Sequence, residues 1–329
     1  MLRVKFVDFP VDVIQTRTIA LLEEAFGEVE LSDDPDFLFY SAFGHEHLKY
    51  DCVRIFWTGE NIQPDFNICD YAIGFGRMTF EDRYRRIPLY YFYEEDYKKA
   101  IEKHEFQEAE LAKKNRFCNF IYSNGMASPE REQFFRLLSR YKRVDSGGGF
   151  LNNIGGPVSN KYEFQQHYKF SIAFENSSMS GYATEKILQA FAAKTIPIYW
   201  GDPKIGEDFN ERAFINCHNY KSFEEVVEAV KEIDRNDDLF LSYLREPIGT
   251  KERFPDNPLL SYEEFVKSIC QQTPAEAMRR SNIMRGQFYQ EEQRSFYFPE
   301  KRGVTERLKQ LPRFLVRGIA GRKGIDNLL

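Results

Sequence analysis

The residues best suited to chemistry are Glu185 and Lys186, which follow the loop 177–184 (SSMSGYAT). The apolar pattern of 184–193 predicts a helix with Thr184 as its N-cap, so both residues fall in the first turn. A helix N-terminus offers unpaired N–H donors and a partial positive charge, and a lysine there is unfavourable unless an anion docks beside it. A nucleotide diphosphate is such an anion. Glu185 has an ordinary explanation as a favourable first-turn residue, and a carboxylate beside a bound ribose could also accept two hydroxyl hydrogen bonds.

Two further segments could contact a ligand. Glycines at 147–149, and again at 155–156, follow a predicted strand. Exposed backbone N–H groups in such a turn can bind an anion, although glycines also serve ordinary turns. Glu60 follows the apolar run 53–57, and ligands of open α/β sheets bind beyond the carboxyl ends of the strands. A carboxylate there could act as a general base, and a solvated surface glutamate is the alternative.

Several chemistries are not supported by any motif. The sequence has no P-loop, no nucleophile elbow and no HExxH motif, and the pair His45 and His47 has no matching third ligand, so no metal site is predicted. The five cysteines form no CxxC pair, which suits a reducing compartment. With 45 basic and 51 acidic residues the formal charge is −6, which argues against nucleic acid as a partner.

The elements that must position these residues alternate between short apolar runs and helical patterns, which predicts an α/β fold with mostly parallel sheets. A charged stretch at 94–115 separates two such series, so we expect an N-terminal domain at 1–112 and a C-terminal domain at 113–290. Strands are expected at 2–9, 37–40, 53–57, 71–75, 117–122, 143–145, 170–174 and 195–200, and helices at 14–26, 130–141, 184–193 and 223–233.

The segment 291–329 is predicted to be a basic amphipathic tail. Its last thirty residues, 300–329, carry eight basic and three acidic side chains. Such a segment could lie on an anionic membrane surface, or pack as a surface helix on its own domain. Because the sequence shows neither a leader nor an apolar run of membrane-spanning length, we expect a cytoplasmic protein, with peripheral contact on the inner face of the membrane through the tail as an alternative.

Three ordered motifs resemble a known family. Residues 174–187 (FENSSMSGYATEKI), 196–201 (IPIYWG) and 208–210 (DFN) are similar to the signature of the α-1,3/4-fucosyltransferases, glycosyltransferase family 10. The stretch 58–74 resembles the amino-terminal domain of the bacterial members. The resemblance implies a GT-B architecture, in which two Rossmann-like domains face each other across a cleft and the C-terminal domain binds the donor GDP-fucose.

The resemblance also implies roles for individual residues. Glu60 matches the general base that takes the proton from the acceptor hydroxyl. Asn176, Tyr182, Glu185 and Lys186 match positions that hold the nucleotide. Lys186 would neutralise the diphosphate leaving group, and Glu185 would bind ribose or fucose hydroxyls.

One residue departs from the family pattern. Family members often carry an arginine on the β-phosphate shortly after the glycine-rich turn, and here Asn152 occupies that place. An amide lacks the charge and the fork geometry of a guanidinium. Asn152 would therefore donate one neutral hydrogen bond, or another cation, Arg116 or Lys161, would substitute.

Together these patterns predict an inverting α-1,3 (or α-1,4) fucosyltransferase. It would move L-fucose from GDP-β-L-fucose to an N-acetyllactosamine-type, Lewis-antigen-like glycan. No cofactor or metal is required by this chemistry, although stimulation by a divalent cation stays open. Two alternatives are a GT-B transferase of another nucleotide sugar and a catalytically silent protein that binds sugar nucleotides. The linkage, the acceptor and the oligomeric state are left open.

Overall fold

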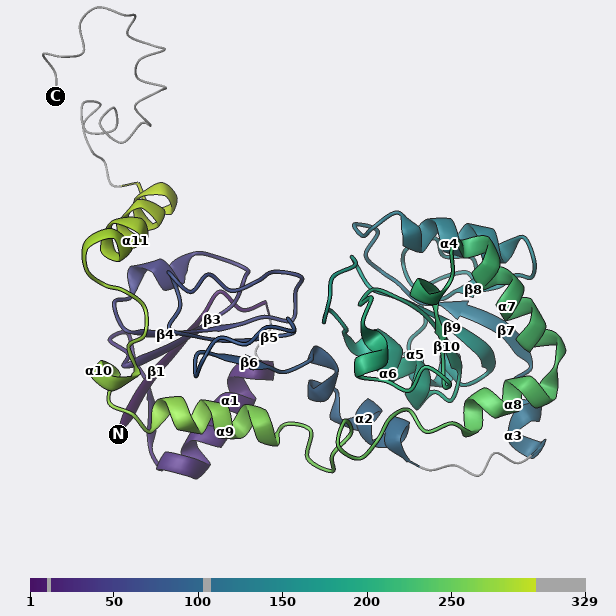
Figure 1. Cartoon of the computed structure of the whole chain (residues 1–329), viewed down its shortest axis with the longest axis horizontal. Helices are drawn as coiled ribbons and strands as arrows, with labels where there is room; N and C mark the ends of the chain where they lie inside the picture. The colour runs from purple at the N-terminus through teal and green to yellow at the C-terminus, as the bar shows by residue number, and fades with distance from the viewer. Residues whose placement is uncertain (11–12, 103–107, 300–329) are drawn as a thin grey trace, which may run out of the picture.

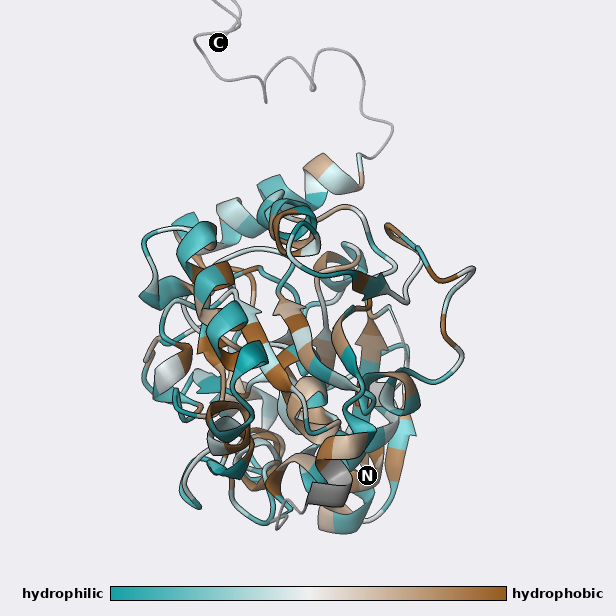
Figure 2. Cartoon of the chain, turned by 90° about the vertical axis from the view of Figure 1, so that its right-hand side faces the viewer, coloured by the Kyte–Doolittle hydropathy of each residue, from teal (hydrophilic) through white to brown (hydrophobic). Residues whose placement is uncertain are grey.

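The computed structural model describes residues 1–10, 13–102 and 108–299, so the basic segment 300–329 lies outside the described residues. The chain forms two α/β units, each built on a parallel sheet (Figure 1). The expected α/β class with two Rossmann-like domains is confirmed. Figure 2 shows that the hydrophobic residues gather on the central strands, while the outer helices present hydrophilic residues to solvent.

The first unit contains a six-stranded sheet with the order β2-β1-β3-β4-β5-β6. Its central strands β3 and β4 are buried along their whole length, as strands inside parallel sheets are, although β4 includes the buried Arg54. The helix α1 (Val13–Phe26) packs into the same core through Leu21 and Leu22. The strands are β1 (Leu2–Val7), β2 (Val29–Leu31), β3 (Phe37–Tyr40), β4 (Val53–Trp57), β5 (Tyr71–Gly74) and β6 (Tyr84–Arg86).

The second unit contains a five-stranded sheet with the order β11-β10-β9-β7-β8. Its longest strand, β9, is central and carries the site motif at its carboxyl end. The strands are β7 (Arg116–Phe120), β8 (Val144–Ser146), β9 (Tyr168–Phe174), β10 (Ile196–Trp200) and β11 (Ile215–Asn216). The helices of this unit are α3 (Glu108–Lys113), α4 (Glu130–Ser139), α5 (Lys161–Gln165), α6 (Glu185–Ala192), α7 (Phe223–Arg235) and α8 (Asp237–Arg245).

The chain crosses between the units twice, and the crossings differ from the expected boundaries. The helix α2 (Glu94–Ile101) precedes residue 112, yet its Tyr97 shares a core with Ile187 of the second unit. The helix α9 (Leu260–Cys270) lies within 113–290, yet its Phe265 and Ile269 pack in the core of the first sheet. Helical spacing shows which face of a helix is buried but not which sheet covers it.

The described part of the expected C-terminal tail begins inside a helix. After α10 (Pro274–Ala277), the helix α11 (Met284–Tyr297) lies beside the first unit, and none of its residues is buried (Figure 1). Its contacts with that unit include a stack of Tyr297 on His45 and a hydrogen bond from Tyr289 to Asp65. The expected start of the tail at 291 therefore falls in the middle of α11.

Candidate functional site

The candidate site lies where the carboxyl ends of β4 and β9 meet between the two units. Glu60 and Asn61 follow β4, and the amide Nδ2 of Asn61 donates to Ser177 Oγ, just after β9, at 2.6 Å. Burial raises the pKa of Tyr182, and the charges of Glu175 and Glu60 raise it further. The loop that carries Glu60 and the loop that carries Tyr182 are therefore joined across the boundary between the two units by the Asn61–Ser177 hydrogen bond.

The Glu60 side chain is exposed, and its backbone N–H is held by the side chain of Thr58, two residues earlier. Glu60 N donates to Thr58 Oγ1 at 3.0 Å, and the Thr58 side chain is buried at the end of β4. The Glu60 carboxylate makes no hydrogen bond or ion pair with the described residues. A solvated carboxylate on a fixed backbone can accept a proton from a ligand hydroxyl.

The backbones of the two units approach each other closely at Gly181 and Phe75. Gly181 has φ +90°, and a Cβ there would lie 2.4 Å from the carbonyl oxygen of Phe75, so only glycine fits. The Phe75 ring contacts Tyr182 edge-on at 5.0 Å. Beside them, Arg77 Nη2 donates to Asp202 Oδ2 and Asp208 Oδ2, each at 2.9 Å. The loop 177–184 is thus packed directly against the first unit.

The N-terminus of α6 is arranged around a buried carboxylate that the sequence did not single out. Glu175 is 0% exposed and accepts from Thr184 N at 2.8 Å and from Thr184 Oγ1 at 2.6 Å. Thr184 is the N-cap residue, as predicted, but its hydroxyl is turned to Glu175 and makes no cap bond. The first N–H groups of α6 therefore have no side-chain cap, which suits an anion.

Lys186 is neutralised by two carboxylates. Its Nζ lies 3.2 Å from Glu175 Oε2 and 3.3 Å from Glu185 Oε1. Burial acts to lower the pKa of Lys186, but these carboxylates raise it above its usual value. The unfavourable position of a lysine in the first turn is therefore already compensated without a ligand, which differs from the sequence argument. The sequence argument missed Glu175 because it lies eleven residues before Lys186, directly after the end of β9.

Glu185 lies close to two lysines, Lys186 and Lys161. Burial acts to raise the pKa of Glu185, but the charges of Lys186 and Lys161 lower it below its usual value. Lys161, at the start of α5, donates to Gln189 Oε1 at 2.6 Å, and burial lowers its pKa. Lys161 is thus close to the predicted donor residues. Arg116 is not, because it pairs with Tyr168 Oη at the amino end of the sheet.

Asn152 is used inside its own loop. Its Nδ2 donates to Gly148 O at 2.7 Å, and its Oδ1 accepts from Gly156 N at 2.9 Å and from Ile154 N at 3.3 Å. A Cβ on Gly148 would lie 2.0 Å from Tyr122 O, so the turn approaches the segment after β7 too closely for another residue. The Asn152 amide therefore stabilises the glycine-rich turn through hydrogen bonds within its own loop, and it points into that loop.

Asn176 is fixed by α4. Arg131 Nη2 donates to Asn176 Oδ1 at 2.7 Å, and Ser128 N donates to Asn176 O at 2.8 Å. Arg131 is 1% exposed and stacks on Tyr122, with its Cζ 4.1 Å from the ring centroid. The sequence did not single out Arg131, which appears there as an ordinary residue of an amphipathic helix.

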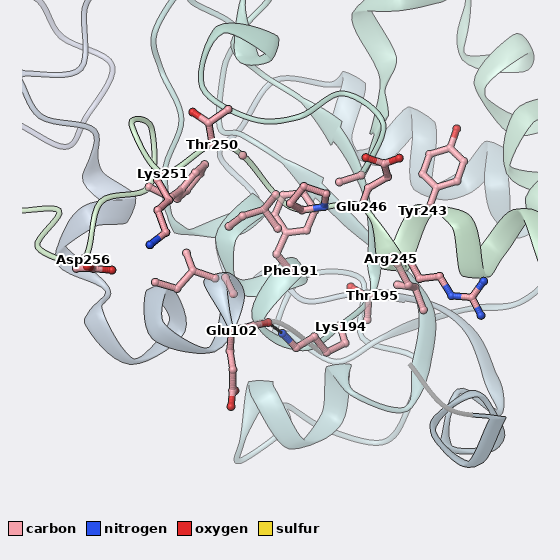
Figure 3. A pocket seen from close by; sticks show the side chains of 18 residues that line it. Glu102, Phe191, Lys194, Thr195, Tyr243, Arg245, Glu246, Thr250, Lys251 and Asp256 are labelled. Atoms are coloured by element: carbon pink, nitrogen blue, oxygen red, sulfur yellow. Dashed lines mark hydrogen bonds between the residues drawn. The ribbon is translucent and has the colours of Figure 1, made fainter. Parts of the chain in front are cut away.

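A cavity of about 730 Å³ lies away from this site. Figure 3 shows Phe191, Lys194 and Glu246 among the side chains around it. It adjoins Thr195, at the amino end of β10, whereas the predicted donor residues lie at the carboxyl ends of the strands. None of the predicted site residues lines it.

The described residues contain no cluster of three histidine, cysteine or acidic side chains that could hold a metal ion. Among the helices of the described ranges, none is both long enough and apolar enough to cross a membrane.

Two family models match the chain. The model for the α-(1,3)-fucosyltransferase FucT N-terminal domain matches residues 4–93, and the model for the C-terminal part of glycosyltransferase family 10 (fucosyltransferase) matches residues 111–277, about half of the chain. The α-(1,3)-fucosyltransferase FucT of Helicobacter pylori is 37% identical over 262 residues, which are 68% of this chain and 54% of that protein. The chain thus spans about half the length of this curated relative.

Solved structures give the same result for the fold. An α1,3-fucosyltransferase structure is 28% identical, with a TM-score of 0.73 over 86% of this chain and 93% of that one. An α1,3-fucosyltransferase crystallised with GDP-fucose is 29% identical, with a TM-score of 0.66 over 80% of this chain and 90% of that one. The Anabaena protein HepE, crystallised with UDP and glucose, is 8% identical, with a TM-score of 0.51 over 83% of this chain and all of that one, which shows the fold alone. These likenesses support the expected GT-B architecture.

Proposed function

Since the chain belongs to glycosyltransferase family 10, the fucosyltransferases, we propose that it transfers L-fucose from GDP-β-L-fucose to an N-acetylglucosamine-type acceptor. The product would carry an α-1,3 linkage, as the names of its relatives suggest, and the anomeric configuration would be inverted. The acceptor would be an N-acetyllactosamine-type glycan. The α-1,4 linkage is the variant to be tested.

The observation that carries the proposal is the juxtaposition of Glu60 with the loop 177–184. Glu60 comes from the first unit, and the Asn61–Ser177 hydrogen bond joins its loop to the second unit. The first turn of α6, which has no side-chain cap and carries Lys186, would supply the anion-binding side. A base on one side and an anion-binding turn on the other are the two groups that a single displacement needs.

In this proposal the reaction is a single displacement at C1 of fucose. The acceptor hydroxyl oxygen forms a bond to C1 of fucose as the bond from C1 to the phosphate oxygen of GDP breaks. Glu60 takes the hydroxyl proton, and the bonding electron pair leaves with GDP. Because charge develops on the departing diphosphate, donors already aimed at it stabilise the transition state more than the ground state.

The residues proposed to hold the donor divide the work by chemistry. Lys186 and the N–H groups of α6 would bind the diphosphate, and Glu185 would accept hydroxyl hydrogen bonds from ribose or fucose. Asn176 and Tyr182 would complete the nucleotide site. No resident metal or cofactor is part of this scheme, and stimulation by a divalent cation would have to act through the phosphates.

The test is donor turnover by the wild type and by Glu60→Gln. We expect GDP release from GDP-fucose that rises with acceptor, no comparable release from GDP-mannose or UDP-glucose, and a rate lower by about 100-fold or more in Glu60→Gln at unchanged GDP affinity. Glu24→Gln, an exposed change on α1, is the control. Release from another nucleotide sugar in preference would favour the rival transferase, and GDP binding without turnover would favour a catalytically silent protein.

A further inference from the structure

Arg77 reaches from the first unit into the second and meets three carboxylates there. It follows β5, and its Nη2 lies 2.9 Å from both Asp202 Oδ2 and Asp208 Oδ2. Its Nη1 lies 3.0 Å from Glu207 Oε2. All three acids belong to the connection between β10 and β11, so one arginine of the first unit pairs with a single segment of the second.

These ion pairs are largely shielded from solvent. Asp202 is 0% exposed and Asp208 8%, and the Arg77 side chain is 16% exposed. Asp208 has a second cation, because Arg86 Nη2 of β6 lies 2.6 Å from its Oδ2. Asp202 forms an ion pair with no other described residue. Because a buried carboxylate is costly without its cation, Asp202 ties the segment after β5 to the end of β10.

In the second unit, this contact is attached to the proposed donor loop 177–184. Gly201, directly before the acidic segment, accepts from Ser178 Oγ through its carbonyl oxygen at 2.6 Å. Arg77 also packs on Gly181, where a Cβ would lie 3.3 Å from Arg77 Cγ. The position of Arg77 is therefore linked to that of the loop at two points.

In the first unit, the contact is attached to the segment that carries Glu60. The strand β5, which precedes Arg77, pairs with β4, and Ile73 O accepts from Thr58 N at 3.1 Å just beyond β4. Thr58 Oγ1 in turn accepts from Glu60 N. Short hydrogen-bonded segments thus connect Arg77 with the proposed base.

We propose that Arg77 is a positioning residue, which fixes the first unit against the second so that Glu60 faces the donor held by the loop 177–184. The inference rests on the proposed function, because it assumes that Glu60 and this loop act in one reaction. A base must lie within hydrogen-bond reach of the hydroxyl whose proton it takes, and a misplacement of about 1 Å can cost about 100-fold in rate. Arg77 acts through the two loops, since its guanidinium is engaged by carboxylates.

Replacing Arg77 by methionine should separate catalysis from donor binding. The proposed donor residues all belong to the second unit, so GDP affinity measured by calorimetry should stay within about threefold of the wild type. The kcat with a type 2 acceptor and saturating GDP-fucose should fall about 10- to 100-fold. A kcat within about twofold of the wild type, or an equal fall in kcat and GDP affinity, would overturn the proposal. The matched control is Arg3→Met, because Arg3 also bridges two aspartates, Asp34 and Asp36, but within the first unit. It should alter neither value.

A second variant tests whether the fall in kcat is only a loss of stability. Arg77→Met leaves Asp202 buried without its cation, so the melting temperature should fall. Adding Asp202→Asn removes that charge, while Asp208 keeps Arg86, so the melting temperature should rise again. We expect kcat to stay low, because the contact between the units is still missing. A kcat that recovers with the melting temperature would overturn the proposal.

The separation of the two units can be measured without any turnover. The five native cysteines are buried, so spin labels on Glu24→Cys in α1 and Arg140→Cys after α4 report this separation by electron paramagnetic resonance. We expect a wider distribution of distances in the variant with Arg77→Met and Asp202→Asn than in the wild type, and an equal distribution would overturn the proposal. If the wild type transfers no fucose, the proposed function fails, and the distance measurement still decides the role of Arg77.

Discussion

Replacing Lys186 by methionine should affect stability and GDP affinity through different contacts. In the folded chain Lys186 Nζ lies 3.2 Å from Glu175 Oε2, and Glu175 is fully buried. Removing one partner of a buried pair costs about 3–5 kcal/mol. We expect the lower end, about 3 kcal/mol, because Thr184 N and Oγ1 still donate to the Glu175 carboxylate.

A second change separates the two effects. Glu175→Gln combined with Lys186→Met removes both charges of the buried pair and leaves the partly exposed Glu185 with Lys161 nearby, so most of the lost free energy of unfolding should return. The affinity for GDP should not return, because the cation proposed for the diphosphate is still missing. We expect a loss of about 1.5–3 kcal/mol, or roughly 10- to 100-fold, in both the single and the double variant.

The assay is thermal unfolding without ligand and GDP calorimetry on the wild type, the two single variants and the double variant. Lys98→Met, an exposed change on α2, is the control for loss of a surface charge. A double variant that binds GDP as tightly as the wild type would refute Lys186 as a diphosphate ligand. A Lys186→Met protein as stable as the wild type would refute the buried pair as a stabilising contact.

Three further predictions follow from other parts of the chain. Asn152→Arg should lower the free energy of unfolding by about 1–3 kcal/mol, because an arginine cannot accept hydrogen bonds from Gly156 N and Ile154 N as Asn152 Oδ1 does. It should also not tighten GDP binding. Urea unfolding and GDP titration measure these two effects. Burial lowers the pKa of His47 although its Nδ1 lies 2.8 Å from Asp8 Oδ2. Below a pH of about 6.5 the unfolded chain then binds more protons than the folded one, so stability should fall as the pH drops below that value. The slope of melting temperature against pH should be shallower in His47→Gln. Transfer of fucose should persist in excess EDTA, and a rate abolished by EDTA and restored by a divalent cation would contradict the metal-free scheme.

The parts of the fold that the sequence predicts well are those with strong local patterns. The strands β3 and β4 coincide with the expected strands at 37–40 and 53–57, because strands buried on both faces are mostly apolar. The edge strands β2 and β6 were not predicted, since each has only three residues, too few to establish a pattern. Short edge strands are defined by their neighbours in the sheet and leave little trace in sequence.

The sequence predicted the motifs of the site, but it did not predict the buried residues that contact them. The loop 177–184 and Glu60 stand out because of their residue types beside predicted strands. The partners Glu175 and Arg131 do not, because burial gives them their importance and burial depends on the tertiary packing of β9 and α4. The inward turn of Asn152 likewise follows from three bonds within its loop that spacing does not reveal.

The most direct test of the central claim is the structure of the product formed from GDP-β-L-fucose. The purified chain is incubated with the donor and, separately, with type 1 and type 2 N-acetylglucosamine-containing disaccharides, and the products are analysed by NMR. We predict an α-linked fucose on O3 of the N-acetylglucosamine of the type 2 acceptor, with GDP released in equal amount. A β-linked product would contradict the inverting displacement, and GDP-fucose left unconsumed with both acceptors would contradict the proposed transfer to N-acetylglucosamine.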